Sequence, residues 1–473
     1  MNDVITKYEL VVGLEVHAQL RTQSKAFCSD STDFGALPNT LLSPISMGHP
    51  GTLPRFNGQV LEYGILLGLA MNCKIREYNE FARKNYFYAD LPKGYQITQD
   101  AQPVCVGGEI EVMVEGQPKT IRIHHVHMEE DAGKSMHDQD PTRTMIDLNR
   151  AGVVLMEIVS KPDIRTPEEA GAYVKKMRAI VRYLGTCDGN MEEGSMRVDA
   201  NVSVHKPGTM FGTRCEIKNV NSIRAVGKAI DYEARRQVDV LESGGTIRQE
   251  TRHWDDSEGR THTLRVKEDA DDYRYFLEPD LVLLDPGAEW VESIRASLPM
   301  LPAARRARLS QLTGADKESE AVYVIVERGQ DDYVQLVADA GGEPARALVY
   351  VQQAFSEAGA NPSVPAKDLA GLTLLERDAK VTATQAKTIL AEIVANGGGD
   401  AVAIAAAKGF EALDTSAVEA MVDAAIAAQP DAWAKYCAGE EKAMGALVGA
   451  IMKSSQGKAD GKVVTALLQA KRG

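Results

Sequence analysis

The chain has 473 residues, with 53 Lys and Arg against 67 Asp and Glu and a formal net charge of −14 at pH 7. This length exceeds what one hydrophobic core holds, and the acidic balance excludes a general binder of nucleic-acid backbones such as DNA, so any nucleic-acid contact is local. The scattered cysteines form no C-x-x-C pair, the N-terminus has no signal-peptide pattern and no window approaches about eighteen apolar residues, which predicts a reduced cytoplasmic protein without a membrane span.

The first predicted element is a strand over residues 8–20, in which apolar and polar side chains alternate. Leu14 and Val16 belong to its apolar face, whereas Glu15 and His17 point together to the other face. We therefore expect one face of the strand to be buried and the other to be available for chemistry.

Residues 124–131 form the densest charged cluster, with three histidines and three acids. Carboxylates and a histidine suit a hard divalent cation such as Mg²⁺ that accompanies phosphate, and a solvated charged loop is the alternative. Gly133, Lys134 and Ser135 follow, but they do not complete a phosphate-binding loop, because Glu129 and Glu130 place negative charge where backbone amides should face the phosphate. If ATP binds, another device must hold it.

Two helices and two more strands follow in the predicted first domain. A capping box with proline at the first helical position predicts a helix over residues 166–184, and apolar periodicity predicts another over 222–241. Alternation predicts strands over residues 197–205 and 213–219. Together these elements favour an α+β domain whose mostly antiparallel sheet is covered by helices on one side.

Charged runs of mixed sign occur at residues 191–199, 214–219 and 267–275. Acids that hold a metal beside Arg or Lys side chains that neutralise phosphate oxygens suit phosphoryl transfer, and a surface ion-pair network is the alternative. None of the cysteines lies on the glycine-flanked turn that a cysteine glutaminase requires. We therefore predict inert buried thiols and no release of ammonia by this chain itself.

Composition changes near residue 285, after which the chain is Ala-rich and has a helical pattern. We predict domains at residues 1–286, 287–397 and 398–473, with the second boundary at the glycines of 397–399. Residues 438–473 hold six basic groups against three acids. Lys442, Lys453 and Lys458 are therefore candidates for contact with RNA phosphates, and an ordinary Lys-rich helix end is the alternative.

Short motifs follow one another along the chain: V-G-L-E-V-H at 12–17, P-G-T-L-P at 50–54, R-K-N-Y-F-Y at 83–88, H-M-E-E-D-A-G-K-S at 127–135, M-E-E-G-S at 191–195, E-I-K-N at 216–219 and D-Y-R-Y-F at 272–276. In content and order they resemble the signatures of the GatB family, which belongs to the aspartyl/glutamyl-tRNA(Asn/Gln) amidotransferases. The resemblance continues through residues 447–459 and thus covers most of the chain.

The resemblance implies a carbon–nitrogen ligase with glutamine as amido donor, which uses ATP and Mg²⁺. In this family ATP phosphorylates the side-chain carboxylate of glutamyl-tRNA(Gln) or aspartyl-tRNA(Asn), and ammonia then displaces the phosphate. An amidase-type glutaminase subunit supplies the ammonia from glutamine through a tunnel, and a small third subunit completes the heterotrimer. The implied fold is a cradle-shaped α+β catalytic domain, an all-α helical domain and a small helical tail that contacts tRNA.

The same resemblance implies roles for individual residues. The metal ligands are expected to be Glu15, His17 and Glu130, although alternation along the strand does not choose between Glu129 and Glu130. Together with Glu216 these three residues form the expected catalytic set. The residues expected to bind the nucleotide are Lys84, Lys134, Arg197 and Lys218, and those expected to bind tRNA are Lys442, Lys453 and Lys458.

Some relatives carry a four-cysteine zinc site in the region of residues 28–47, where this chain keeps only Cys28. We therefore expect no structural zinc. Two other interpretations of the charged clusters stay open on sequence alone. One is a metal-dependent hydrolase or nuclease, which would not need ATP. The other is a tRNA-binding scaffold without catalytic activity, in which the acids of the strands only dock partners.

Overall fold

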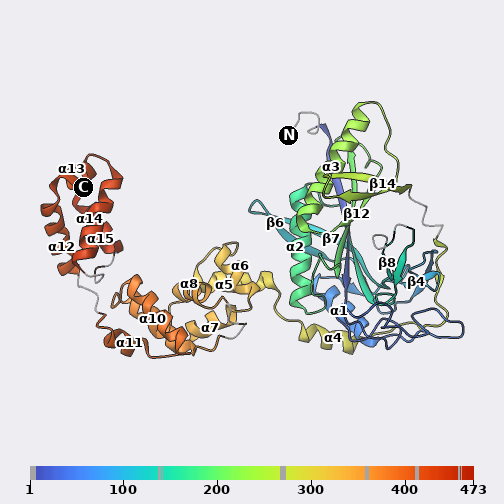
Figure 1. The fold of residues 1–473 in the computed structure, drawn as a ribbon, viewed down its shortest axis with the longest axis horizontal. Coiled ribbons are helices and arrows are strands. Elements are labelled where there is room, and N and C mark those ends of the chain that lie inside the picture. The colour runs from blue at the N-terminus through green and yellow to red at the C-terminus, as the bar shows by residue number, and fades with distance from the viewer. Residues whose placement is uncertain are drawn as a thin grey trace. The chain divides into compact units, whose positions relative to one another are not determined.

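The computed structural model describes residues 7–136, 140, 142–266, 273–356, 359, 362–410, 415–455, 459 and 461–472. The chain forms two compact units, Met1–Leu301 and Pro302–Gly473 (Figure 1). Helix α4, Ala288–Ser297, belongs to the first unit because it packs against α1, Gly58–Ala70, and buries Ile294 in the same core. The first unit therefore extends beyond the predicted boundary at residue 286.

One large sheet dominates the first unit. Its strands are β1 Glu9–Gln19, β2 Lys74–Ile75, β3 Ala82–Asn85, β4 Tyr95–Thr98, β5 Cys105–Val106, β6 Glu109–Val114, β7 Gln117–Glu130, β10 Val154–Ser160, β11 Met196–His205, β12 Cys215–Val220, β13 Glu250–Asp255, β14 Arg260–Val266 and β15 Phe276–Leu277. The central order is β14-β13-β12-β11-β1-β10-β7-β4-β3-β15, and β8, Lys134–Met136, pairs with β9, Met145–Asp147, in a separate ribbon. Among the described pairs only β12–β13 is parallel, so the predicted α+β class with a mostly antiparallel sheet is confirmed.

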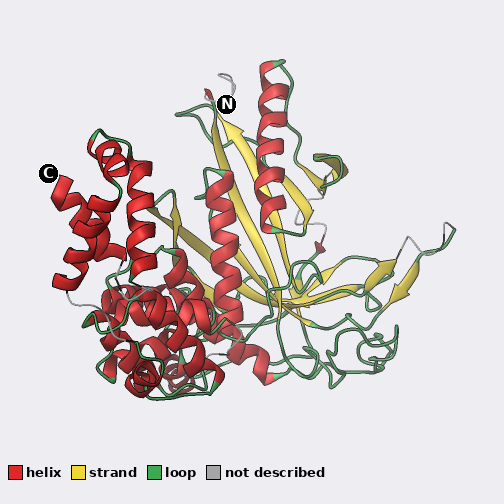
Figure 2. Cartoon of the chain, turned by 60° about the vertical axis from the view of Figure 1, so that its left-hand side comes forward, coloured by secondary structure: helices red, strands yellow, loops and turns green. Residues whose placement is uncertain are grey.

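Helices α2, Pro167–Tyr183, and α3, Ile223–Glu242, run alongside the long strands (Figures 1 and 2). The predicted cap of α2 is present, because the Thr166 hydroxyl accepts a hydrogen bond from the backbone of Glu169 at 3.1 Å. Side chains of α2 such as Tyr173 and Met177 enter the same core as the apolar face of β1. Covering this face by helices leaves the polar face of the central strands to form a site.

The register of the central strands brings distant segments side by side. On β1, His17 faces Glu157 of β10 and Arg197 of β11. On β10, Glu157 also faces His127 of β7. Because side chains alternate along each strand, residues paired in this way share one face of the sheet. Charged residues that the sequence separates widely therefore meet on the polar face.

The regular elements of the second unit are all helices among its described residues. Its helices are α5 Pro302–Thr313, α6 Glu320–Glu327, α7 Asp331–Asp339, α8 Pro344–Ala354, α9 Ala366–Arg377, α10 Ala383–Ala395, α11 Ala401–Ala407, α12 Thr415–Ala428, α13 Pro430–Cys437, α14 Glu441–Ser454 and α15 Gly461–Arg472. They build two hydrophobic clusters, one from Leu309 to Ala405 and one from Val418 to Leu468. The first cluster thus reaches past the predicted boundary at residue 397, because α11 packs on α9. Among the described residues no helix has the length and apolar character needed to cross a membrane.

Candidate active site

A cavity of about 360 Å³ lies on the polar face of the sheet. Strands β1, β3, β7, β10, β11 and β12 all contribute to its lining. The charged residues of the lining are His17, Lys84, Glu129, Asp131, Glu157, Arg197, Asp199 and Lys218. Four of the predicted site residues, His17, Lys84, Arg197 and Lys218, therefore meet here. We call this cavity the catalytic pocket.

Glu157 lies at the centre of a group of buried histidines and acids. Its Oε2 is 3.3 Å from His17 Nε2 and 3.3 Å from His127 Nε2, and His127 Nε2 is 3.6 Å from Glu129 Oε2. Burial would raise the pKa of Glu157, but His127 and His17 hold that pKa well below its usual range. Burial would also lower the pKa of each histidine, but Glu157 outweighs this effect and raises the pKa of His17 to about 9 and that of His127 to about 10.

The group of His17, Glu129 and Glu157 is suited to a cation. One ligand atom from each lies within 4.8 Å of the other two. Oxygen-rich donor sets of this kind are what Mg²⁺ recruits from proteins, usually with several retained waters. We refer to these three residues as the first acid group.

A second acid group consists of Glu15, Asp199 and Glu216, whose ligand atoms also lie within 4.8 Å of one another. Burial raises the pKa of Glu15, and the neighbouring acids raise it further. Lys218 compensates part of this charge, because its Nζ contacts Asp199 Oδ2 and lies 3.0 Å from Glu216 Oε1. The second group therefore already holds one positive charge of its own.

Neutral side chains hold two acids of the second group in place. Asn201 Nδ2 on β11 donates to Glu15 Oε1 at 2.9 Å, and Thr251 Oγ1 on β13 donates to Glu216 Oε2 at 3.0 Å. Each donor lies on a strand that pairs in the sheet with the strand of the acid that it binds. The orientation of each carboxylate is thus fixed by the pairing of strands.

Cationic side chains flank the two acid groups. Arg197 Nη2 donates to both carboxylate oxygens of Asp131 at 3.1 Å, and Gln19 Nε2 donates to Asp131 Oδ2 at 2.8 Å. Burial would lower the pKa of Lys84, but Glu129 leads the negative groups that raise it above its usual value. Lys84 is therefore a charged ammonium at neutral pH, and the pocket alternates anions and cations at close range.

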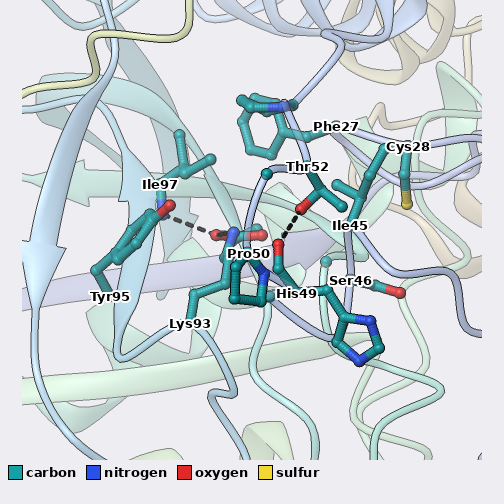
Figure 3. A pocket seen from close by; sticks show the side chains of 15 residues that line it. Phe27, Cys28, Ile45, Ser46, His49, Pro50, Thr52, Lys93, Tyr95 and Ile97 are labelled. Atoms are coloured by element: carbon teal, nitrogen blue, oxygen red, sulfur yellow. Dashed lines mark hydrogen bonds and ion pairs between the residues drawn. The ribbon is translucent and has the colours of Figure 1, made fainter.

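The structure does not bring Glu130 together with Glu15 and His17. Glu130 Oε1 accepts from the backbone of Ile97 at 2.8 Å and pairs with Lys93 in a separate cavity of about 230 Å³. Figure 3 shows Tyr95 and Ile97 on one side of this cavity and Cys28, Ile45 and Ser46 on the other. Glu130 lies away from His17 because side chains alternate along β7. This alternation turns Glu130 toward the apolar face of the sheet, with Met128, and leaves Glu129 beside the catalytic pocket.

The other predicted residues lie outside the catalytic pocket. Lys134 lines a third cavity, of about 870 Å³, next to it. Lys442 and Lys453 are exposed on α14 of the second unit. Lys458 and residues 267–272 of the predicted charged run 267–275 lie outside the described residues.

The structure adds Glu157 and Asp199 to the candidate site and places Glu129, rather than Glu130, beside the pocket. Glu157 is the one acid of the strand V-L-M-E-I-V-S, whose other side chains are mostly buried. A lone acid in an otherwise apolar strand is a usable signal, because a buried carboxylate needs a partner. Asp199 lies in the charged run of residues 191–199, but that run by itself does not single it out.

The cysteines agree with the prediction of inert thiols for the four that are buried, Cys73, Cys105, Cys187 and Cys215. Burial raises the pKa of Cys73 to about 12, so no reactive thiolate forms there. Cys28 is half-buried and Cys437 is exposed. Near Cys28, Asp30 Oδ2 accepts from the Ser46 hydroxyl at 2.6 Å and from the Ser43 backbone at 2.9 Å, which holds this loop by hydrogen bonds.

Comparison with known families covers both units of the chain. Residues 10–292 match the GatB/GatE catalytic domain, and residues 332–471 match the GatB domain. The chain belongs to the GatB family. This confirms the resemblance seen in the ordered motifs.

Curated relatives match the GatB-family chain along almost its whole length. It is 47% identical to the B subunit of the aspartyl/glutamyl-tRNA(Asn/Gln) amidotransferase of Acidiphilium cryptum, with 98% of this chain and 97% of the relative covered. The protein of the same name from Rhodospirillum rubrum is 48% identical, with the same coverage of 98% and 97%. That from Gluconobacter oxydans is 46% identical, again over 98% of this chain and 97% of the relative.

Proposed function

We propose that this chain is the component of a tRNA amidotransferase that uses ATP to activate the amino acid on glutamyl-tRNA(Gln), on aspartyl-tRNA(Asn) or on both, and converts it to the amide. The observation that carries the proposal is the meeting of the first acid group and of Asp199 from the second with Lys84, Arg197 and Lys218 in the catalytic pocket. Such a set suits phosphoryl transfer, where the protein positions the reactants and balances charge. The names of the relatives point to the same reaction.

The first acid group fits Mg²⁺ better than the second. His17, Glu129 and Glu157 offer three donors within 4.8 Å of one another. In the second group Lys218 already supplies a positive charge, which lowers the attraction for a further cation. A bound Mg²⁺ would neutralise charge on the phosphate oxygens of ATP during transfer.

The cations of the pocket would bind and orient the reacting phosphate. Lys84, Arg197 and Lys218 come from three different strands, so their ammonium and guanidinium groups surround the pocket. Asp131 holds Arg197 in one orientation, and this pre-organisation favours binding in a single geometry. In the proposed sequence a side-chain carboxylate oxygen bonds to the γ-phosphorus of ATP and ADP leaves. The nitrogen of ammonia then bonds to the carbonyl carbon, and phosphate leaves with that carboxylate oxygen and a proton lost from nitrogen.

The remaining parts of the proposal concern partners. An amidase-type glutaminase partner would release ammonia from glutamine, because no described cysteine of this chain has the setting of a glutaminase nucleophile. A small third protein would complete the heterotrimer in the cytoplasm. The helices of the second unit would form the helical domain and the tRNA-contacting tail, with Lys442 and Lys453 of α14 facing tRNA phosphates.

The test is amide formation on glutamyl-tRNA(Gln) by the assembled complex with Mg²⁺-ATP and either glutamine or ammonium chloride. Glu157→Gln is expected to lower kcat/KM with both nitrogen sources by at least about a hundredfold. Glu292→Gln is the matched control, because this acid is 66% exposed on α4. Full activity of Glu157→Gln would favour a scaffold, and turnover without ATP would favour a hydrolase; either result would refute the proposal.

A further inference from the structure

Three histidines of β7 form a row that leads from the surface of the sheet to the first acid group. His124 is exposed, His125 is half-buried and His127 is buried, with 8% of its surface exposed. His125 and His127 are two residues apart and therefore share one face of the strand. Their rings stack at a centroid distance of 5.1 Å and an interplanar angle of 22°. His127 does not line the catalytic pocket, so its effect on the reaction must pass through its neighbours.

A β-bulge brings His124 into this row. Ser160 of β10 pairs with Ile123, and the next pair along the two strands is Val159 with His125. His124 is thus an extra residue on β7. Its Nδ1 lies 2.6 Å from Nδ1 of His125, although adjacent residues of a regular strand point to opposite faces. The bulge therefore ends the row at an exposed side chain.

The Nε2 atom of His127 bridges two of the three donors of the first acid group. It lies 3.3 Å from Oε2 of Glu157 and 3.6 Å from Oε2 of Glu129. Because ionised carboxylates only accept hydrogen bonds, this nitrogen carries a hydrogen. Glu129 and Glu157 have ligand atoms within 4.8 Å of each other, so the two carboxylates repel. The N–H of His127 offsets this repulsion and keeps both carboxylates beside His17.

His125 fixes the rotation of the His127 ring. Nδ1 of His127 lies 3.0 Å from Nε2 of His125. Burial and the charge of His127 lower the pKa of His125 to about 4, so His125 is neutral at pH 7 and its Nε2 accepts the hydrogen of Nδ1. A half-turn of the His127 ring would place carbon atoms where its two nitrogens now lie and would break both contacts. The contact with His125 therefore keeps Nε2 directed at the two acids.

We propose that His127 is a positioning residue that holds Glu129 and Glu157 in the arrangement that binds a divalent cation, and that His125 acts through His127. This inference rests on the cation site of the proposed function and extends it to two residues outside the catalytic pocket. Residues that orient metal ligands by hydrogen bonds commonly contribute roughly 10- to 100-fold to metal affinity. Neither histidine would touch the cation or the substrate.

Replacing His125 tests this chain of contacts without changing an acid or a residue of the pocket. His125→Leu removes the acceptor for His127, whereas His125→Gln keeps one, because the amide oxygen of Gln can take the place of Nε2. The probe is Mn²⁺, whose binding to the full-length chain is followed by electron paramagnetic resonance. We expect His125→Leu to lose affinity roughly tenfold and His125→Gln to keep most of it.

Two further variants frame this comparison. His127→Leu removes the bridging N–H itself and should lose at least as much Mn²⁺ affinity as His125→Leu. His262→Gln is the control, because it removes a contact of the same kind, 2.8 Å from His262 Nε2 to Glu258 Oε2, on the exposed strand β14. The affinity of this control should equal that of the wild type.

Amide formation by the assembled complex at varied Mg²⁺ separates positioning from a loss of folded protein. In His125→Leu the Mg²⁺ concentration for half-maximal rate should rise roughly tenfold, while kcat at saturating Mg²⁺ changes little. A purely structural role would instead lower kcat and leave the Mg²⁺ requirement unchanged. His125→Gln should return the Mg²⁺ requirement toward that of the wild type.

Three results would overturn this inference alone: wild-type Mn²⁺ affinity in His125→Leu or in His127→Leu, an equal loss in His125→Leu and His125→Gln, or a lower kcat with an unchanged Mg²⁺ requirement. A wild-type chain that binds no Mn²⁺ would refute the cation site of the proposed function and this inference with it. The wild-type titration therefore distinguishes the two failures.

Discussion

Replacing Glu129 by Gln is expected to weaken Mg²⁺ binding in the catalytic pocket, whereas replacing the adjacent Glu130 is not. Glu129 is one of three donors whose ligand atoms lie within 4.8 Å of one another. Glu130 points to the opposite face of β7 and pairs with Lys93. Two neighbouring acids of equal size and charge therefore provide matched variants of each other.

Glu129→Gln should lose metal affinity, whereas Glu130→Gln should lose free energy of unfolding. Changing even a residue that supports a metal ligand commonly costs 10- to 100-fold in metal affinity, so losing a carboxylate donor at position 129 should cost at least about a hundredfold, or about 2.7 kcal/mol. Glu130 is 3% exposed, and breaking its ion pair leaves Lys93 without its buried partner. Because Gln can still accept from the Ile97 backbone, we expect Glu130→Gln to lose about 3 kcal/mol in free energy of unfolding, the lower end for a broken buried pair.

Isothermal titration of the full-length chain with Mg²⁺, and with Mn²⁺ as a tighter-binding probe, measures the metal affinity. Urea unfolding followed by the fluorescence of the first unit measures the free energy of unfolding. If Glu130→Gln lost metal affinity while Glu129→Gln kept it, the assignment of the first acid group would be wrong. The sequence-based choice of Glu130 as the ligand would then be the correct one.

Three further outcomes are expected. In metal-free buffer the ion pair of Glu157 with His127 stabilises the fold fully below a pH of about 6.5, which is the pKa of histidine in the unfolded chain. This contribution is lost as the pH rises through the pKa of His127 in the folded chain, about 10. In a pH series of urea unfolding, the free energy of unfolding should therefore decline less in Glu157→Gln than in the wild type. Asp331 is 1% exposed and pairs with two arginines of α5, so Asp331→Asn should cost the second unit about 3 kcal/mol in unfolding free energy, measured by circular dichroism. The double variant Lys442→Glu and Lys453→Glu should weaken tRNA binding and make its salt dependence shallower by about two phosphate contacts, and an unchanged salt slope would exclude α14 from the tRNA surface.

Local patterns predicted the elements that carry the site. Alternation along β1 placed Glu15 and His17 on one face, and the cap at Thr166 located the start of α2. These predictions succeeded because the pleat of a strand and the first turn of a helix depend on residues close in sequence. The ordered motifs also identified the family, which the matches to residues 10–292 and 332–471 confirm.

Partners across the sheet were beyond the reach of the same reasoning. His17, Glu157 and Arg197 face one another only because β1 lies between β10 and β11 in antiparallel register. Likewise, the pairing of His127 with Glu157 fixes which face of β7 carries Glu129 and which carries Glu130. A shift of the register by one residue would exchange these faces, so strand alternation alone could not make the choice.

The sequence by itself determined the family, the α+β class with its helical second half, and the polar faces of single strands, because composition, caps and alternation are local properties. The tertiary structure alone decided which charges share a pocket, that Glu130 turns away from His17, and that Lys134 lines a neighbouring cavity. The physical reason is that a site on an antiparallel sheet is built from the register between strands, and register is set by the packing of the whole sheet against its helices.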